Sequence, residues 1–158
     1  MMHASHYTAE GNSMQCIIYT RVSTQEQGDS KLGLEAQLGA CLGFCTKEGL
    51  APLMHLEEIA TGGVGLEGRP VLAQAFELAR KAKACVLVSK LDRLSREVRL
   101  ISALMEGRTD FYTVEDGLDC PPLMLHMKAV IGEHERRMIG QRTKAALGAK
   151  KARGEALG

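Results

Sequence analysis

The feature of this sequence that most constrains its fold is an unbroken apolar run at residues 84–89, Ala-Cys-Val-Leu-Val-Ser. Its side chains do not alternate between apolar and polar, which is typical of a central parallel strand covered on both faces. A second short run, at 15–22, is rich in β-branched residues and predicts another buried strand. Because parallel strands need crossover connections, usually helical, the two runs predict an α/β fold.

The remaining periodicities are consistent with that fold. Apolar residues recur at helical spacing over 33–48 and 70–83, and a further helix is expected from near Asp92 to residue 106. In such a helix Asp92 and Arg96 would lie four residues apart on one side. Shorter strands are expected at 50–56 and 111–114. We therefore predict a mostly parallel central sheet of about four strands, flanked by helices.

A long helix is predicted at the C-terminal end, because no proline follows Pro122. Over residues 122–150 its length would be roughly 42 Å, whereas a compact domain of the remaining residues would be roughly 35 Å across. We therefore expect this helix to extend from the domain. Apolar residues concentrate at its root, which favours self-association, and basic residues at its tip, which favour nucleic acid. A frayed, solvated tail beyond Gly140 is the alternative.

The net charge of +1 conceals a strong asymmetry along the chain. Residues 1–132 carry 13 Lys/Arg against 16 Asp/Glu, whereas residues 133–153 carry 7 Lys/Arg against 2 Glu. Positive charge confined to one end predicts a polyanionic partner there. The basic residues that we expect to meet it are Arg142, Lys144, Lys150, Lys151 and Arg153.

Length and composition limit the class of protein. At 158 residues the chain fits one domain with an appended helix, preceded by a polar segment at 1–14 that we expect to be disordered. No apolar run approaches membrane-spanning length and no signal-peptide pattern is present, which predicts a cytoplasmic protein. The 5 cysteines are scattered. Only Cys41 and Cys45 have helical spacing, and no second pair accompanies them, so we expect neither a metal site nor another cofactor.

Charged and hydroxyl side chains follow the two predicted buried strands. Arg21 and Ser23 lie two residues apart, so they share one face at the carboxyl end of the first strand, where open α/β sheets bind ligands. A guanidinium beside a hydroxyl suits a phosphate group. Arg93 and Arg96 follow the second strand, and Arg69 ends a glycine-rich loop. The alternatives are solvated strand ends, a surface ion pair and a flexible connection.

Five blocks of sequence occur in a characteristic order. They are Tyr19-x-Arg21-Val22-Ser23-Thr24, Leu34-Glu35-x-Gln37, Gly68-Arg69-Pro70-x-Leu72, Leu91-Asp92-Arg93-Leu94-x-Arg96, and Glu133-His-Glu135-Arg136-x-x-Ile139-x-x-Arg142-Thr143. Together they span about residues 15–153, nearly the whole chain. This ordered set resembles the catalytic domain of the serine recombinases, the resolvase/invertase family.

The resemblance implies a DNA recombination reaction without metal or ATP. Ser23 would be the nucleophile that forms a transient 5′-phosphoserine link. The active-site arginines would be Arg21, Arg69, Arg93 and Arg96, and the supporting polar residues Asp92, Gln37, Glu135 and Arg136.

The same resemblance implies a catalytic domain at 15–120 and a helix at 121–153 that serves dimerisation and DNA contact. The implied partners are double-stranded DNA and further copies of the chain, as a homodimer and as a tetramer during strand exchange. No separate DNA-binding domain is expected in this sequence. A catalytically idle dimerisation and DNA-docking module is an alternative, and a small phosphate-ester hydrolase or nucleotide binder is another.

Overall fold

The computed structural model describes residues 13–23, 30–60, 65–95 and 97–154. Four parallel strands form one sheet in the order β2-β1-β3-β4. They are β1 (Gln15–Val22), β2 (Ala51–Ile59), β3 (Cys85–Val88) and β4 (Phe111–Thr113). The two apolar runs of the sequence form the central strands β1 and β3. The predicted parallel sheet is therefore confirmed.

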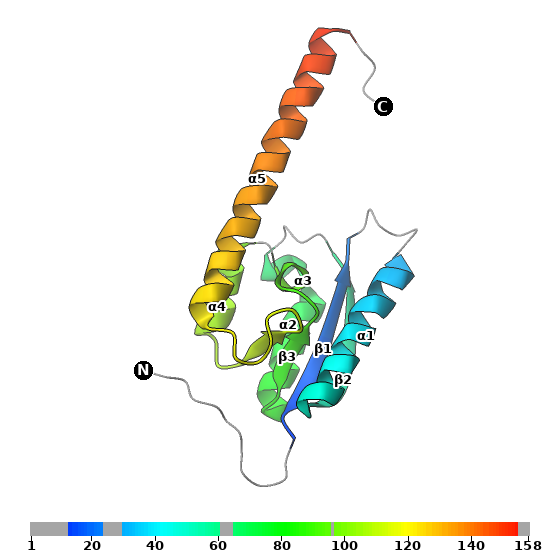
Figure 1. Cartoon of the computed structure of the whole chain (residues 1–158), viewed down its shortest axis with the longest axis vertical. Coiled ribbons are helices and arrows are strands. Elements are labelled where there is room, and N and C mark those ends of the chain that lie inside the picture. Colours follow the sequence, from blue (N-terminus) through cyan, green and yellow to red (C-terminus); the bar gives the residue numbers. More distant parts are fainter. Residues whose placement is uncertain (1–12, 24–29, 61–64, 96, 155–158) are drawn as a thin grey trace.

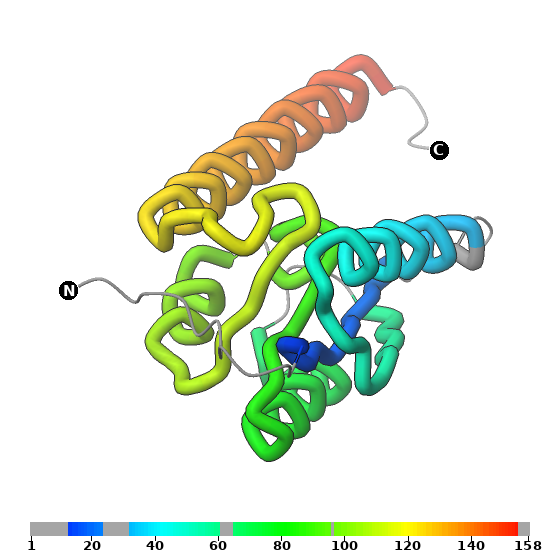
Figure 2. The backbone as a smooth tube through the Cα atoms, turned by 60° about the horizontal axis from the view of Figure 1, so that its bottom comes forward, coloured from blue at the N-terminus to red at the C-terminus, as the bar shows by residue number. Residues whose placement is uncertain are grey.

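Helices cover both faces of this sheet (Figures 1 and 2). The α1 helix (Ser30–Glu48) packs on one face, where Cys41 and Phe44 contact a core that includes Cys16 and Leu87. On the other face, a larger core contains residues from every remaining α-helix. These are α2 (Pro70–Ala82), α3 (Leu91–Leu94), α4 (Val98–Glu106) and the root of α5 (Pro122–Ala152). A short 3-10 helix, η2 (Leu66–Gly68), precedes α2.

The expected single helix from Asp92 to residue 106 is wrong. It is divided into α3 and α4, because Ser95 adopts an extended conformation with φ −162° and ψ 159°. The predicted spacing of Asp92 and Arg96 on one helical side therefore does not hold, and Arg96 itself lies outside the described residues. The β2 strand also continues to Ile59, beyond the predicted residue 56, because it stays in register with β1 as far as Val22.

The α5 helix extends from the domain as predicted (Figure 1). Its 31 residues correspond to roughly 46 Å of helix. Only Leu125 and Ala129 on it are buried, and every residue from 139 to 152 is exposed. None of the helices in the described ranges is long and apolar enough to cross a membrane. Of the segment at 1–14 that we expect to be disordered, residues 1–12 lie outside the described residues, and the Met14 carbonyl accepts the Ala51 N–H at 2.9 Å.

Candidate active site

The sheet brings the ends of β1 and β3 to one edge. β1 pairs with β3 over Cys16–Ile18, so its last four residues lie beyond the stretch that is paired with β3. Ser23 follows β1 directly and is half-buried. The hydroxyl predicted to be the nucleophile therefore lies at the carboxyl edge of the sheet, where ligands bind in open α/β folds.

The side chain of Arg21 donates hydrogen bonds to backbone carbonyl oxygens. Its Nε donates to the carbonyl oxygen of Arg93 at 3.1 Å, and its two terminal nitrogens donate to those of Asp92 at 3.0 Å and Ala60 at 2.6 Å. The residue is only 2% exposed. Arg21 thus ties α3 and the chain after β2 to the end of β1.

Arg69 is more deeply enclosed, at 0% exposed. Its Nε lies 3.3 Å from a carboxylate oxygen of Glu58, and a terminal nitrogen donates to the Tyr19 hydroxyl at 2.6 Å. Further hydrogen bonds reach the carbonyl oxygens of Arg93, at 3.1 Å, and Leu94. Arg69 therefore joins β1 and β2 to α3, and it shares the Arg93 carbonyl with Arg21.

Tyr19 and Glu58 complete this buried group. The tyrosine hydroxyl donates to Glu58, whose other oxygen accepts the backbone N–H of Val71 at 3.0 Å. Burial, and then the hydrogen bond to Glu58, raise the pKa of Tyr19. We call Tyr19, Glu58 and Arg69 the buried triad. Its ionic groups are paired, as a buried charge requires.

Gln37 and Arg93 bind the backbone of Arg21, two residues before Ser23. From α1, the Gln37 side chain accepts the Arg21 N–H at 3.2 Å and donates to the Arg21 carbonyl at 3.1 Å. Arg93 donates to the same carbonyl at 3.4 Å, and its Nε lies 3.7 Å from Asp92 Oδ1. The Arg93 side chain is 27% exposed. The site thus presents the half-buried hydroxyl of Ser23 and the partly exposed guanidinium of Arg93. The buried side chains of Arg21 and Arg69 support it from the interior of the protein.

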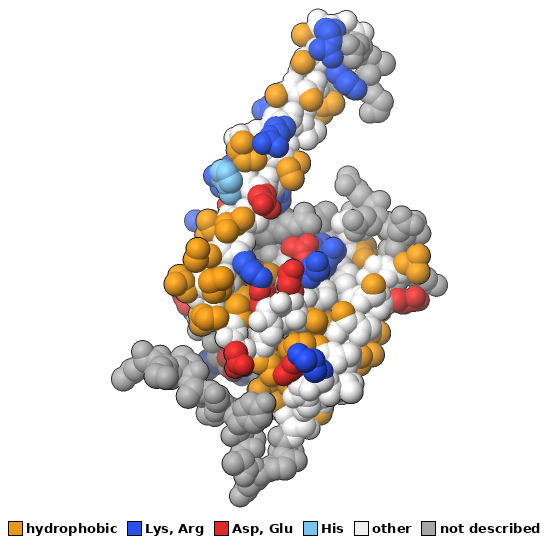
Figure 3. Space-filling model, in the orientation of Figure 1, with side chains coloured by type: hydrophobic (Ala, Val, Ile, Leu, Met, Phe, Trp, Pro, Cys, Tyr) orange, Lys and Arg blue, Asp and Glu red, His pale blue; other side chains and the backbone are white. Residues whose placement is uncertain are grey.

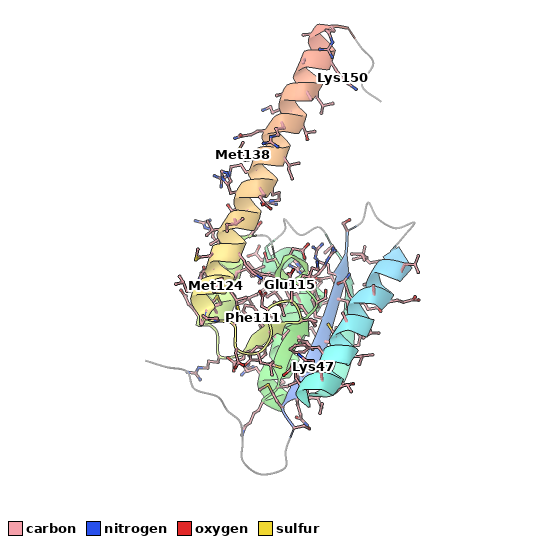
Figure 4. All side chains as sticks on the ribbon, in the orientation of Figure 1. Lys47, Phe111, Glu115, Met124, Met138 and Lys150 are labelled. Atoms are coloured by element: carbon pink, nitrogen blue, oxygen red, sulfur yellow. The ribbon has the colours of Figure 1, made fainter. Side chains whose placement is uncertain are left out.

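Other predicted site residues lie elsewhere. Glu135 and Arg136 are exposed on α5, and in the described part of the chain neither forms a hydrogen bond or ion pair with the cluster. The basic residues predicted to bind DNA are exposed on the outer half of α5 and at its C-cap, and Lys150 marks the helix tip far from the sheet (Figure 4). They are Arg142, Lys144, Lys150, Lys151 and Arg153.

Glu58, Glu133 and the role of Tyr19 were not predicted from the sequence. Glu58 falls beyond the predicted end of its strand, and two adjacent glutamates are unusual in a strand. That acidic pair, close to a loop that carries an arginine, was the available signal. Glu133 stands in the last of the five blocks, but its spacing there indicates no contact with a helix so distant in sequence.

The cysteines considered for a metal are part of the core under α1. Cys16, Cys41, Cys45 and Cys85 are all buried, and the sulfurs of Cys16 and Cys45 lie 3.6 Å apart. Burial raises the pKa of the Cys41 and Cys85 thiols to about 12. These residues are uncharged at neutral pH and pack as small apolar side chains.

Comparison with known proteins places this geometry among DNA recombinases. A family model described as resolvase, N-terminal domain, matches residues 16–156. The DNA-invertase hin of Salmonella typhimurium is 36% identical over 97 residues, covering 56% of this chain and 50% of that protein. The chain spans about half the length of several curated relatives that it matches.

Two solved structures have the same fold. A resolvase family site-specific recombinase from Streptococcus pneumoniae superposes with a TM-score of 0.58 at 27% identity, covering 89% of this chain and 99% of that one. The N-terminal catalytic domain of TP901-1 integrase gives a TM-score of 0.56 at 27% identity, covering 78% and 98%.

Proposed function

The chain belongs to the resolvase N-terminal domain family, and from that premise we propose that it is the catalytic part of a site-specific DNA recombinase. The observation that carries this proposal is the cluster at the sheet edge. A half-buried hydroxyl, Ser23, follows a strand whose final residues are fixed from three elements by Gln37, Arg69 and Arg93. A strand end that is held in this way suits a reaction that needs a positioned nucleophile.

In the proposed reaction the Ser23 hydroxyl oxygen attacks a DNA phosphorus in line. The bond from phosphorus to the 3′-oxygen breaks, the serine proton is released, and the 3′-oxygen leaves as a hydroxyl. A 5′-phosphoserine remains, and reversal of the step on a new partner rejoins the strand. Because the phosphoester is kept as a covalent link, no ATP is consumed.

The arginines fall into two roles in this proposal. Arg93 is partly exposed and stabilises negative charge on the non-bridging phosphate oxygens, together with Arg96. Asp92 holds the Arg93 guanidinium from one side. Arg21, Arg69 and Gln37 act as positioning residues, since their polar atoms are bonded inside the protein. Glu135 and Arg136 would support the site only after a movement of α5, or from a second copy.

We further propose that α5 makes the contacts between copies and with DNA. Its exposed apolar face lies opposite the packed side that holds Leu125, and its orange side chains gather at the root of the helix (Figure 3). This face is formed by Leu123, Met124, Met127, Val130 and Ile131, which are 45–69% exposed. A second copy would cover it to give a homodimer, and two dimers would join for strand exchange. The basic tip would contact DNA phosphates, which would place the protein on the cytoplasmic nucleoid.

A denaturing gel tests the proposed reaction. The chain is incubated with a nicked duplex, both alone and fused to a foreign DNA-binding domain, and a covalent protein–DNA adduct is sought. We expect the adduct in the unmutated chain, none in Ser23→Ala, and normal amounts in Ser102→Ala, a half-buried serine of α4 outside the cluster. DNA binding without an adduct in either format would instead identify an idle docking module. An adduct that survives in Ser23→Ala would exclude the assigned nucleophile.

A further inference from the structure

The start of α4 is held by a side chain from α5. The backbone N–H of Val98, the first residue of α4, donates to a carboxylate oxygen of Glu133 at 3.2 Å. The residue at the cap position, Glu97, makes no side-chain hydrogen bond to the helix, and its first turn contains no acidic residue. Helix N-termini have unsatisfied N–H groups and a partial positive charge. Glu133 therefore caps the N-terminus of α4 from a helix that is distant in sequence.

Glu133 is itself held in place. Its second carboxylate oxygen accepts a hydrogen bond from Arg137, one turn further along α5, at 3.1 Å. The Glu133 side chain is only 29% exposed. Each carboxylate oxygen thus has a separate partner, which leaves the side chain little freedom to leave the α4 N-terminus.

The capped end of α4 lies close to the candidate active site. Three residues, 95–97, separate α3 from α4. Ser95 is 2% exposed, donates its N–H to the Leu91 carbonyl at 2.9 Å and accepts the Glu97 N–H on its hydroxyl at 2.9 Å. Because Glu97 is hydrogen-bonded to Ser95 and Ser95 to Leu91, we expect a displacement of Val98 to be passed on to α3. The carbonyls of α3 are those that Arg21 and Arg69 bind.

We infer that Glu133 is a positioning residue that fixes α3, and with it Arg93, by anchoring the start of α4 to α5. The contacts run from Glu133 to Val98, through the connection to α3, and from α3 to the end of β1 next to Ser23. The inference rests on the proposed recombination reaction. It also makes the placement of the cluster depend on the helix that we propose to pair with a second copy.

The structure offers a matched control on the same pair of helices. Ser102 of α4 and His126 of α5 are joined by a hydrogen bond of 3.2 Å between the hydroxyl and Nε2. This bond also links α4 to α5, but it lies away from the α3–α4 connection. Loss of general docking between the two helices should therefore affect Ser102→Ala and Glu133→Ala alike, whereas loss of positioning should affect only the second.

The experiment compares Glu133→Ala, Glu133→Gln, Glu133→Asp and Ser102→Ala in the full chain, with three readouts. These are affinity for the nicked duplex, the single-turnover rate of adduct formation, and amide hydrogen exchange over residues 95–98. For Glu133→Ala we expect a rate about tenfold lower and Val98 exchange about tenfold faster, as for loss of one charge-assisted hydrogen bond. The affinity should stay within about twofold, because the substitution removes no group that binds a phosphate.

The conservative variants separate two roles of Glu133: the hydrogen bond that it accepts from Val98 and the negative charge that it carries. Gln keeps an oxygen at the same reach, so Glu133→Gln should recover most of the rate and the protection of Val98. Asp keeps the charge but is one methylene shorter, so Glu133→Asp should behave as Ala does. Ser102→Ala should match the unmutated chain in rate and in exchange at 95–98.

Two outcomes would overturn the inference: Val98 protection that is unchanged in Glu133→Ala, or an equal loss of rate in Glu133→Ala and Ser102→Ala. If Glu133→Ala does not fold, Glu133→Gln against Glu133→Asp decides by the same readouts. If the unmutated chain forms no adduct, the proposed reaction fails. The exchange measurement still decides in that case whether Glu133 holds the connection.

Discussion

Two groups of cations in this molecule have opposite environments. At the sheet edge, Arg21 and Arg69 are 2% and 0% exposed, and their donors bind carbonyls, a carboxylate and a hydroxyl. On the outer half of α5, Arg142, Lys144 and Lys150 are exposed to solvent. The first group holds the fold together, whereas the second is available to an external anion. The residue type alone does not distinguish the two roles.

The difference has an energetic basis. A charge that leaves water must be paired and hydrogen-bonded, and removal of one partner leaves the other buried and unpaired. Solvent screens an exposed charge, so its removal changes stability little. Substitutions in the two regions should therefore differ clearly in their effect on the free energy of unfolding.

Arg69→Ala should give the largest loss of stability. It leaves Glu58 buried without its cation, which should lower the free energy of unfolding by about 3–5 kcal/mol. Arg142→Ala, on the exposed helix, should change it by less than about 0.5 kcal/mol. Urea unfolding measures both.

A double variant separates the effect of breaking the Arg69–Glu58 ion pair from the effect of the cavity that truncation of Arg69 leaves. Arg69→Met combined with Glu58→Gln removes both charges, so it should be less destabilising than Arg69→Ala. If Arg69→Ala were as stable as Arg142→Ala, the buried and exposed regions would not differ in this way.

The next largest difference in stability is expected between the buried and the exposed side of the α5 root. Leu125 is 8% exposed and packs in the core, so Leu125→Ala should cost about 2–4 kcal/mol of unfolding free energy. Met127 is 50% exposed, and its truncation should leave monomer stability nearly unchanged. If a second copy covers this face, Met127→Ala should instead raise the dimer Kd about tenfold. Sedimentation equilibrium measures that Kd, and a Kd that stays unchanged would place the contact between copies elsewhere.

The buried thiols predict a loss of stability at high pH. Burial raises the pKa of Cys16, Cys41 and Cys85 above the ordinary value of 9.0, so the folded chain favours the uncharged thiols. The contribution of these thiols to the free energy of unfolding is complete below pH 9.0. It is lost as the pH rises from 9.0 towards about 12. At the ordinary pKa each thiol should lower the free energy of unfolding by about 0.4 kcal/mol.

Urea midpoints between pH 7 and 10 test this dependence, and Cys41→Ala is the control. With one buried thiol fewer, its stability should fall less steeply with pH. A slope identical to that of the unmutated chain would show that this thiol stays un-ionised in both states, or ionises equally in both.

The smallest effect on stability should come from the basic tip of α5. Replacement of Arg142, Lys144, Lys150 and Lys151 by Gln should leave the urea midpoint almost unchanged. The same replacement should flatten the salt dependence of DNA binding by nearly one log–log unit for each phosphate that the helix no longer neutralises. Affinity titrations at several salt concentrations measure this slope. An unchanged slope would mean that the tip does not touch DNA.

The local patterns of the sequence determined much of the fold. The apolar runs at 15–22 and 84–89, the proline at the start of α2, and Gly49 with φ +71° at the end of α1 each act within a few residues. They predicted the strands, the helices and the long α5. The same patterns did not predict the division of 91–106 into α3 and α4, because the break is made by the extended backbone at Ser95 and by a cap from Glu133.

The sequence by itself determined which residues arrive at the sheet edge, since Arg21 and Ser23 end one strand and Arg93 follows another. Only the tertiary structure decided which of these cations are enclosed. The partners of Arg21 include the carbonyls of Ala60, Asp92 and Arg93, and every residue has a carbonyl, so no sequence pattern marks these acceptors. Whether an arginine is buried or exposed depends on which backbone packs against it, and that depends on contacts between elements distant in sequence.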